Sequence, residues 1–149
     1  MAERKILIID DNIFESIAVK GMFEQYQFDS DLAPNGLEAL AMVQARLKCG
    51  GPEKMYKLIM MDYQMPVTDG ADSAIMILDY LREEKLPEAN MPYIVCMSNF
   101  SYGISINEKF MKTGMDEFVC KPIFKLGIYR LLVQARLLKE KVKQYEHLQ

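Results

Sequence analysis

Four short apolar runs along the chain predict buried β-strands. The runs cover residues 5–9, 58–61, 93–97 and 117–120, and each is followed by polar or turn-forming residues. Unbroken apolar stretches of this length are typical of strands that are covered on both faces. A fifth and weaker strand is predicted at about residues 28–33.

Between the strands, apolar residues recur every three or four positions, which predicts helices. Strand and helix alternate five times, an order that predicts an α/β fold with a parallel sheet and helices on both faces. A last helix is predicted to begin near Phe124. The apolar positions that mark the other four helices are Ile13, Ile17, Val19 and Met22, then Leu37, Leu40, Ala41 and Leu47, then Ile75, Leu78 and Leu81, then Ile106, Phe110 and Met111.

The length and composition of the chain are typical of one compact domain. Its 149 residues are 50% hydrophobic and 26% charged, which is ordinary for a globular protein. A net charge of -3 gives no basic surface for direct binding of nucleic acid. No apolar run approaches the roughly 18 residues of a membrane span, and a cytoplasmic location is expected.

The predicted strands deliver acids, a hydroxyl and an amine to one edge of the sheet. Asp10 and Asp11 follow the first strand, Asp62 the third, Ser98 the fourth and Lys121 the fifth. Ligands bind outside the carboxyl ends of parallel strands, so these side chains should converge on one crevice. Three clustered carboxylates repel one another unless a cation lies among them. A divalent metal is therefore expected.

This series of motifs resembles the receiver domain of two-component response regulators and hybrid histidine kinases. The resemblance covers residues 4–136. It implies a flavodoxin-like, doubly wound (βα)5 three-layer sandwich with strand order 2-1-3-4-5, a receiver domain at residues 1–136 and an extension at residues 137–149. The matching motifs are Asp10-Asp11-Asn12, Met61-Asp62-Tyr63-Gln64-Met65-Pro66 with Asp69-Gly70, Ser98, and Lys121-Pro122.

The resemblance also implies a role for each residue of the crevice. Asp62 would be the phosphoacceptor, a nucleophile that takes a phosphoryl group from a phosphohistidine on a histidine kinase or histidine phosphotransfer protein. Mg²⁺, or Mn²⁺, would bind Asp11 directly, Asp10 mainly through water, Asp62, and the backbone carbonyl of Gln64. Lys121 would pair with the phosphoryl oxygens. Such a domain modifies itself and has no external substrate, so it is not a conventional enzyme.

Signal output is implied to begin at Ser98 and Phe118. Ser98 would donate a hydrogen bond to the phosphoryl group, and Phe118 would then rotate inward. The face formed by the fourth helix, fifth strand and fifth helix would change shape. The resemblance further implies a cis peptide bond before Pro122.

Asn99 and Gln64 are predicted to set how long the phosphoryl group stays on Asp62. The family usually has a small residue where Asn99 stands, and Gln64 presents a polar side chain to the same site. His147, the chain's single histidine, lies in a charged tail and is expected to be exposed rather than a phosphodonor.

Two alternatives stay open at this stage. The first is a pseudo-receiver, a binding module that keeps the fold without turning over phosphate; the intact Asp11, Asp62 and Lys121 argue against it. The second concerns the last helix, which would span about 37 Å if it ran through residues 125–149. It would form a coiled-coil homodimer, connect to another domain, or fray.

Overall fold

Five parallel strands form one sheet in the order β2-β1-β3-β4-β5. The computed structural model describes residues 3–99, 110 and 112–140. The predicted fold class and strand order are confirmed. The strands are β1 (Ile6–Ile9), β2 (Ser30–Ala33), β3 (Leu58–Asp62), β4 (Tyr93–Ser98) and β5 (Glu117–Cys120).

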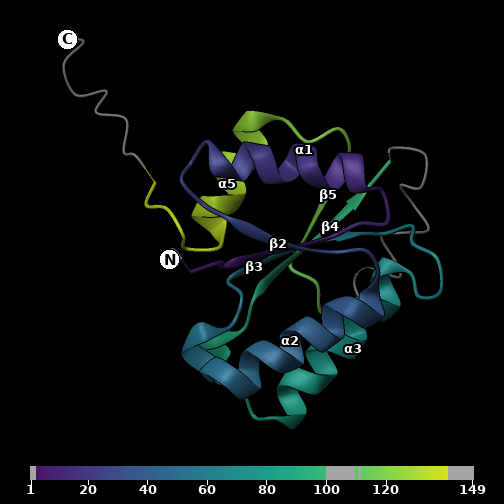
Figure 1. Ribbon diagram of the computed structural model, residues 1–149, viewed down its shortest axis with the longest axis vertical. Coiled ribbons are helices and arrows are strands. Elements are labelled where there is room, and N and C mark those ends of the chain that lie inside the picture. The colour runs from purple at the N-terminus through teal and green to yellow at the C-terminus, as the bar shows by residue number, and fades with distance from the viewer. Residues whose placement is uncertain (1–2, 100–109, 111, 141–149) are drawn as a thin grey trace.

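Helices cover both faces of the sheet (Figure 1), which confirms the three-layer sandwich. On one face lie α1 (Ile13–Glu24) and α5 (Lys125–Gln134). On the other lie α2 (Gly36–Gly50) and α3 (Gly70–Glu83). Two short 3-10 helices, η1 (Pro52–Lys54) and η2 (Glu88–Asn90), precede β3 and β4. The predicted fourth helix lies mainly outside the described residues.

The sheet separates two hydrophobic clusters, which is why β1 is apolar at every position and β3 is apolar up to Asp62. Leu7 and Ile9 of β1 belong to the cluster shared with α2 and α3. Ile6 and Ile8 belong to the cluster shared with α1 and α5. All four side chains are fully buried. Because the sheet is buried on both faces, the strand ends that form the crevice are held in fixed positions. Among the described residues, no helix is long and apolar enough to cross a membrane.

The buried face of α1 differs from the prediction. Ile13 and Ile17 were predicted to face the core, but each is 54% exposed. Val19 is buried as predicted, and the other buried positions of α1 are Ser16 and Phe23, at the three- and four-residue spacing of one helix face. Because apolar residues occur on two faces of α1, their spacing alone did not show which face meets the sheet.

The predicted apolar faces of α2 and α3 are confirmed only in part. On α2, Leu40 and Leu47 pack against the core, but Leu37 is half exposed and the fully buried positions are Ala39 and Val43. On α3, Leu78 and Leu81 are buried as predicted, whereas Ile75 is exposed. Small residues face the sheet at these positions because close packing of helix on sheet favours them over larger side chains.

β2 is shorter at its start than the predicted residues 28–33. Gln27 has a φ of 68°, and the backbone N–H of Phe28 donates to the carbonyl of Phe23 at 3.1 Å. A left-handed residue followed by a bond back into the last turn is typical of a helix C-terminus. Phe28 therefore belongs to the end of α1, and the strand begins at Ser30.

The last helix ends at Gln134, so of the alternatives left open for it, a single helix running on through residues 135–140 does not occur. Arg136 adopts a left-handed φ of 61°. The backbone N–H groups of Leu137 and Leu138 both bond to the carbonyl of Leu132. Both leucines pack back against the core, which a continuing helix would prevent. The rest of the predicted helix, and with it the homodimer seam, lies outside the described residues.

Candidate functional site

The carboxyl ends of β1, β3 and β5 bring Asp10, Asp62 and Lys121 together as predicted. Lys121 Nζ lies 3.1 Å from Asp10 Oδ2 and 3.2 Å from Asp62 Oδ1. Asp10 is 4% exposed and Asp62 is 5% exposed. Burying two carboxylates costs free energy unless a cation or hydrogen bonds compensate. Lys121 supplies one positive charge to two acids.

Asp11 adds a third carboxylate from the solvent side. One oxygen each of Asp10, Asp11 and Asp62 lies within 4.8 Å of the others. Asp11 is exposed and borders an open hollow of about 510 Å³, whose other lining residues are Tyr63, Gln64, Met65, Pro66 and Asp69. Mg²⁺ prefers oxygen ligands and keeps several waters. A set of three carboxylates with one side open to water fits that requirement.

Burial and like charge together shift the acids of this site. Burial raises the pKa of Asp62 to about 7, and the nearby carboxylate of Asp10 raises it as well, against the opposing charge of Lys121. Burial also raises the pKa of Asp10. Burial alone would lower the pKa of Lys121, but hydrogen bonds and charge from Glu15, Asp62 and Asp10 outweigh it, so that pKa is raised. A cation among the acids would favour their charged forms.

Backbone contacts after β3 hold Asp62 in place. The N–H of Tyr63 donates to the carbonyl of Met97 at 2.9 Å, and the N–H of Gly70 donates to the carbonyl of Tyr63 at 2.8 Å. A Cβ atom on Gly70 would lie 2.4 Å from the backbone oxygen of Asp62. Glycine is required at this position because the start of α3 touches the backbone that carries Asp62.

The start of α1 is tied to the same site. Asn12 caps the helix, its side-chain oxygen accepting bonds from the N–H groups of Phe14 and Glu15. The N–H of Asn12 in turn donates to Asp10 Oδ1 at 2.9 Å. This chain of bonds fixes the first turn of α1 relative to Asp10.

Glu15 belongs to the site and was not predicted. Its Oε2 lies 2.5 Å from Lys121 Nζ. The pKa of Glu15 is lowered, chiefly by the hydrogen bond from Lys121. No local pattern identified it, because its partner Lys121 lies 106 residues further along the chain.

Ser98 and Lys121 are coupled through their backbones. The N–H of Lys121 donates to the carbonyl of Ser98 at 2.8 Å, and the Lys121–Pro122 peptide bond is cis, as the resemblance implied. The Ser98 side chain is buried, and its hydroxyl donates to the backbone carbonyl of Asn99 at 3.3 Å. Asn99 itself is exposed beside Lys121 in a smaller hollow of about 300 Å³.

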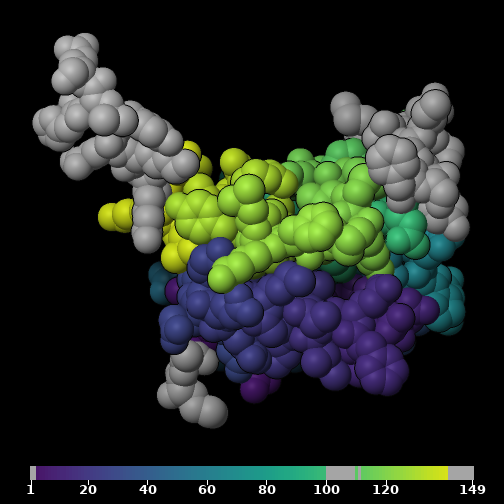
Figure 2. All heavy atoms as spheres, turned by 90° about the horizontal axis from the view of Figure 1, so that it is seen from above, coloured from purple at the N-terminus to yellow at the C-terminus, as the bar shows by residue number. Residues whose placement is uncertain are grey.

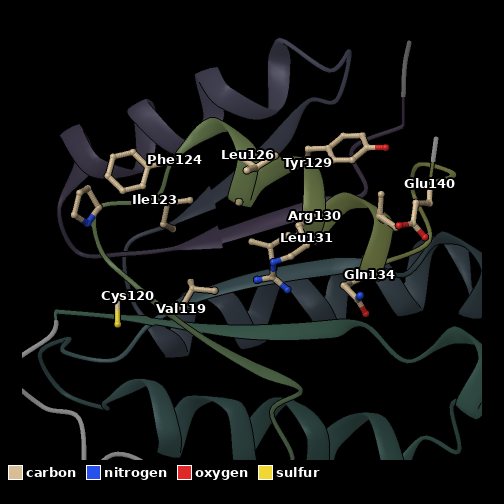
Figure 3. Close-up of a pocket in the computed structure, with 13 residues that line it drawn as sticks. Val119, Cys120, Ile123, Phe124, Leu126, Tyr129, Arg130, Leu131, Gln134 and Glu140 are labelled. Atoms are coloured by element: carbon tan, nitrogen blue, oxygen red, sulfur yellow. The ribbon is translucent and has the colours of Figure 1, made fainter. Parts of the chain in front are cut away.

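Phe118 lies behind the site on β5 and is half-buried. Its ring meets that of Phe110 edge-on, with centroids 6.4 Å apart. Nearby, β5 and α5 line a groove of about 650 Å³ (Figure 3). The groove residues that Figure 3 labels include Val119, Cys120, Leu126, Tyr129 and Arg130.

An exposed apolar surface lies beside the crevice, formed by residues of α1 and of the segment that begins α5. Figure 2 shows the two helices side by side on one face of the molecule. Phe14 is 81% exposed, and the other members are also solvent-accessible. We call this the α1–α5 apolar surface; it consists of Ile13, Phe14, Ile17, Phe124 and Leu126. Several exposed large apolar side chains on two neighbouring helices are typical of a site of protein interaction.

Residues 6–131 match the family model of the response regulator receiver domain. The chain is a receiver domain of this family. The resemblance drawn from the sequence motifs is thereby confirmed. Receiver domains are signalling modules of two-component and phosphorelay systems, not conventional enzymes.

Curated relatives of this receiver domain are mostly far longer proteins. Two-component system protein A of Emericella nidulans is 31% identical over 134 residues, covering 89% of this chain and 17% of the relative. Hybrid signal transduction histidine kinase I of Dictyostelium discoideum is 26% identical over 132 residues, covering 89% of this chain and 7% of the relative. The chain thus spans less than a fifth of either protein.

Solved structures share its fold at lower identity. The receiver domain of the histidine kinase CKI1 from Arabidopsis thaliana, complexed with Mg²⁺, has a TM-score of 0.74 at 22% identity, covering 85% of this chain and 89% of that one. The receiver domain of Ssk1 from Saccharomyces cerevisiae, in a co-crystal with the histidine phosphotransfer protein Ypd1, has a TM-score of 0.71 at 21% identity, covering 97% of each chain.

Proposed function

We propose that this receiver domain accepts a phosphoryl group on Asp62 from a phosphohistidine of a partner protein. The observation that carries the proposal is the buried Asp62 carboxylate, 3.2 Å from Lys121 and clustered with two further acids. A carboxylate oxygen of Asp62 attacks phosphorus, the phosphorus–nitrogen bond to histidine breaks, and the imidazole leaves with the bonding electrons. The product is an aspartyl phosphate.

The residues around Asp62 position the group and balance its charge. Asp10, Asp11, Asp62 and the backbone carbonyl of Gln64 would hold Mg²⁺, with Mn²⁺ as a substitute, and the bound ion neutralises charge on the phosphoryl oxygens. Lys121, already within 3.2 Å of Asp62, binds a phosphoryl oxygen after transfer. Transfer to phosphorus depends mostly on positioning and charge, and these residues supply both.

The output follows from the new charge. A phosphoryl group adds about -1.5 to -2 charge at neutral pH, which draws the Ser98 hydroxyl toward it. Phe118 rotates inward behind Ser98, and the face of the fourth helix, β5 and α5 changes shape. The groove between β5 and α5 (Figure 3) is the described part of that face.

The proposal also covers the lifetime of the aspartyl phosphate and the extent of the receiver unit. Gln64 and Asn99 tune the lifetime of the aspartyl phosphate, since Gln64 is exposed in the hollow that Asp11 borders and Asn99 lies beside Lys121. The receiver unit was expected at residues 1–136, with residues 137–149 as an extension of the last helix. Because Leu137 and Leu138 pack against the core, we propose that the unit reaches residue 138.

Acetyl phosphate with Mg²⁺ tests the proposal directly. The wild-type chain is expected to gain one phosphoryl group, detected by intact mass, and Asp62→Ala to gain none. Asp79→Ala serves as a matched control, because Asp79 is an exposed acid on α3. If the wild type and Asp62→Ala behave identically under all conditions, the chain is a pseudo-receiver. No observation in the site favours that alternative.

The phosphodonor is proposed to dock on the α1–α5 apolar surface. This surface borders the crevice, since Glu15, between Phe14 and Ile17, contacts Lys121. A histidine phosphotransfer protein is the chosen occupant because the similar receiver domain of Ssk1 forms a co-crystal with Ypd1. Burying exposed aromatic and aliphatic side chains would stabilise such a complex.

Phe14→Ala is expected to slow phosphoryl transfer from a phosphorylated histidine phosphotransfer protein, such as Ypd1, by about tenfold. Its rate with acetyl phosphate should stay unchanged, because the small donor needs no docking surface. Leu37→Ala, on α2 and half exposed, is the control and should change neither rate. Equal effects of Phe14→Ala on both donors would contradict the docking site.

A further inference from the structure

Lys121 is saturated with carboxylates in this structure. An ammonium group has three N–H donors. Lys121 Nζ has three carboxylate oxygens around it, at 3.1 Å from Asp10, 3.2 Å from Asp62 and 2.5 Å from Glu15. A phosphoryl oxygen that arrives on Asp62 must therefore displace one of these partners to reach Lys121.

Of the three, Glu15 is the partner without another task at the site. Asp62 is the acceptor itself, and Asp10 belongs to the carboxylate group that fits a cation. The Glu15 side chain is 47% exposed, whereas that of Lys121 is 15% exposed. Glu15 also makes the shortest of the three contacts. It is therefore both the closest competitor for Lys121 and the one most able to move.

The structure leaves room for that movement. Glu15 borders the hollow of about 300 Å³ that separates α1 from the ends of β4 and β5. Lys121 lies at the same hollow, whose apolar wall includes Val19, Met22 and Ile123. A carboxylate at its open rim can rotate into solvent without disturbing the buried acids, since a half-exposed side chain is already partly hydrated and gains hydration by doing so.

We propose that Glu15 is a positioning residue that restrains the phosphorylated state by competing with the phosphoryl group for Lys121. In the unphosphorylated protein Glu15 holds the ammonium group. When a phosphoryl group arrives, the Glu15 carboxylate must give up Lys121 and faces a second negative charge nearby. The inference rests on the proposed function of Asp62. Glu15 would set how readily Asp62 is phosphorylated.

Glu15→Gln tests the proposal, because the amide keeps the size of the side chain and removes its charge. With saturating Mg²⁺, the variant is expected to bind beryllofluoride, a phosphoryl mimic, about fivefold more tightly than the wild type by calorimetric titration. Mg²⁺ alone should bind the variant more weakly, since a nearby negative charge has been lost. A merely structural role would not shift the two affinities in opposite senses.

Glu24→Gln is the matched control, an exposed acid at the other end of α1 whose cation partner is Lys20. It should leave both affinities unchanged. Equal or weaker binding of beryllofluoride by Glu15→Gln would overturn the competition. The proposed function has its own readout: if the wild type gains no phosphoryl group from acetyl phosphate, that function fails whatever the Glu15→Gln affinity.

Discussion

Asp62→Asn is expected to raise the free energy of unfolding by about 2 to 4 kcal/mol at pH 8 in metal-free buffer. The pKa of Asp62 is raised from 3.8 to about 7, first by burial and then by the charge of Asp10. Holding Asp62 ionised in the folded protein therefore costs free energy that an amide of the same shape avoids.

The effect should depend on pH in a defined direction. Because the folded-state pKa is the higher one, the folded protein binds more protons than the unfolded chain between pH 3.8 and about 7. The free energy of unfolding of the wild type should fall as pH rises through this window. The difference in this free energy between Asp62→Asn and the wild type should therefore increase with pH. Urea unfolding at pH 5 and pH 8 measures both quantities.

Asp79→Asn provides the control, since Asp79 is an exposed acid. It should change stability by less than about 0.5 kcal/mol at either pH. Saturating Mg²⁺ should narrow the gap between wild type and Asp62→Asn, because binding to the folded state stabilises it. An Asn variant that is less stable than wild type at pH 8 would show that Asp62 is not under electrostatic strain.

Gly70→Ala is expected to lower the free energy of unfolding by about 2 to 3 kcal/mol and to slow phosphorylation by acetyl phosphate. The added Cβ would lie 2.4 Å from the backbone oxygen of Asp62 and 2.9 Å from the Cα of Tyr63. Both are backbone atoms, so no side-chain rotation relieves the overlap. The end of β3 must shift, and Asp62 shifts with it.

Gly21→Ala separates this effect from the general cost of replacing glycine. Gly21 lies inside α1, and an added Cβ would meet nothing within 4 Å. Alanine should stabilise that helix by up to about 1 kcal/mol. Chemical unfolding of both variants, with the acetyl phosphate rate, checks the prediction. A Gly70→Ala variant as active and stable as Gly21→Ala would refute the close contact.

The sequence predicted the sheet and the crevice well because both depend on strand ends. Asp10, Asp62 and Lys121 each follow an apolar run, and parallel strands place such residues at one edge. Their convergence needed no knowledge of side-chain packing. Gln64 and Asn99 were placed near the site by the family resemblance, and both border its hollows.

Helical faces were predicted less well because they depend on tertiary contacts. Ile13 and Ile17 gave an apolar spacing on α1, yet the sheet is met by the face that carries Val19 and Phe23. Glu15 was missed for a related reason. Its partner Lys121 lies 106 residues further along the chain, and local spacing carries no information on such a pair.

The spacing of apolar residues could not predict where the last helix ends. Apolar residues continue past Gln134 at helical spacing, which left one long helix and a frayed end as equal alternatives. Instead, Arg136 adopts a left-handed conformation, and Leu137 and Leu138 pack, partly buried, against the core. Burial against an existing core outweighed a solvent-exposed continuation of the helix.

The backbone of Ser98 is held by β5, through its pairing with Cys120 and through the bond from the N–H of Lys121 to its carbonyl. A response of Ser98 to phosphate is thus confined to torsion about a single bond, between staggered wells. The hydroxyl would exchange a 3.3 Å bond to a neutral carbonyl for one to a charged oxygen, which is the stronger acceptor. Under the proposed function, this rotation of the Ser98 side chain would therefore lower the free energy and would need no rearrangement of β4.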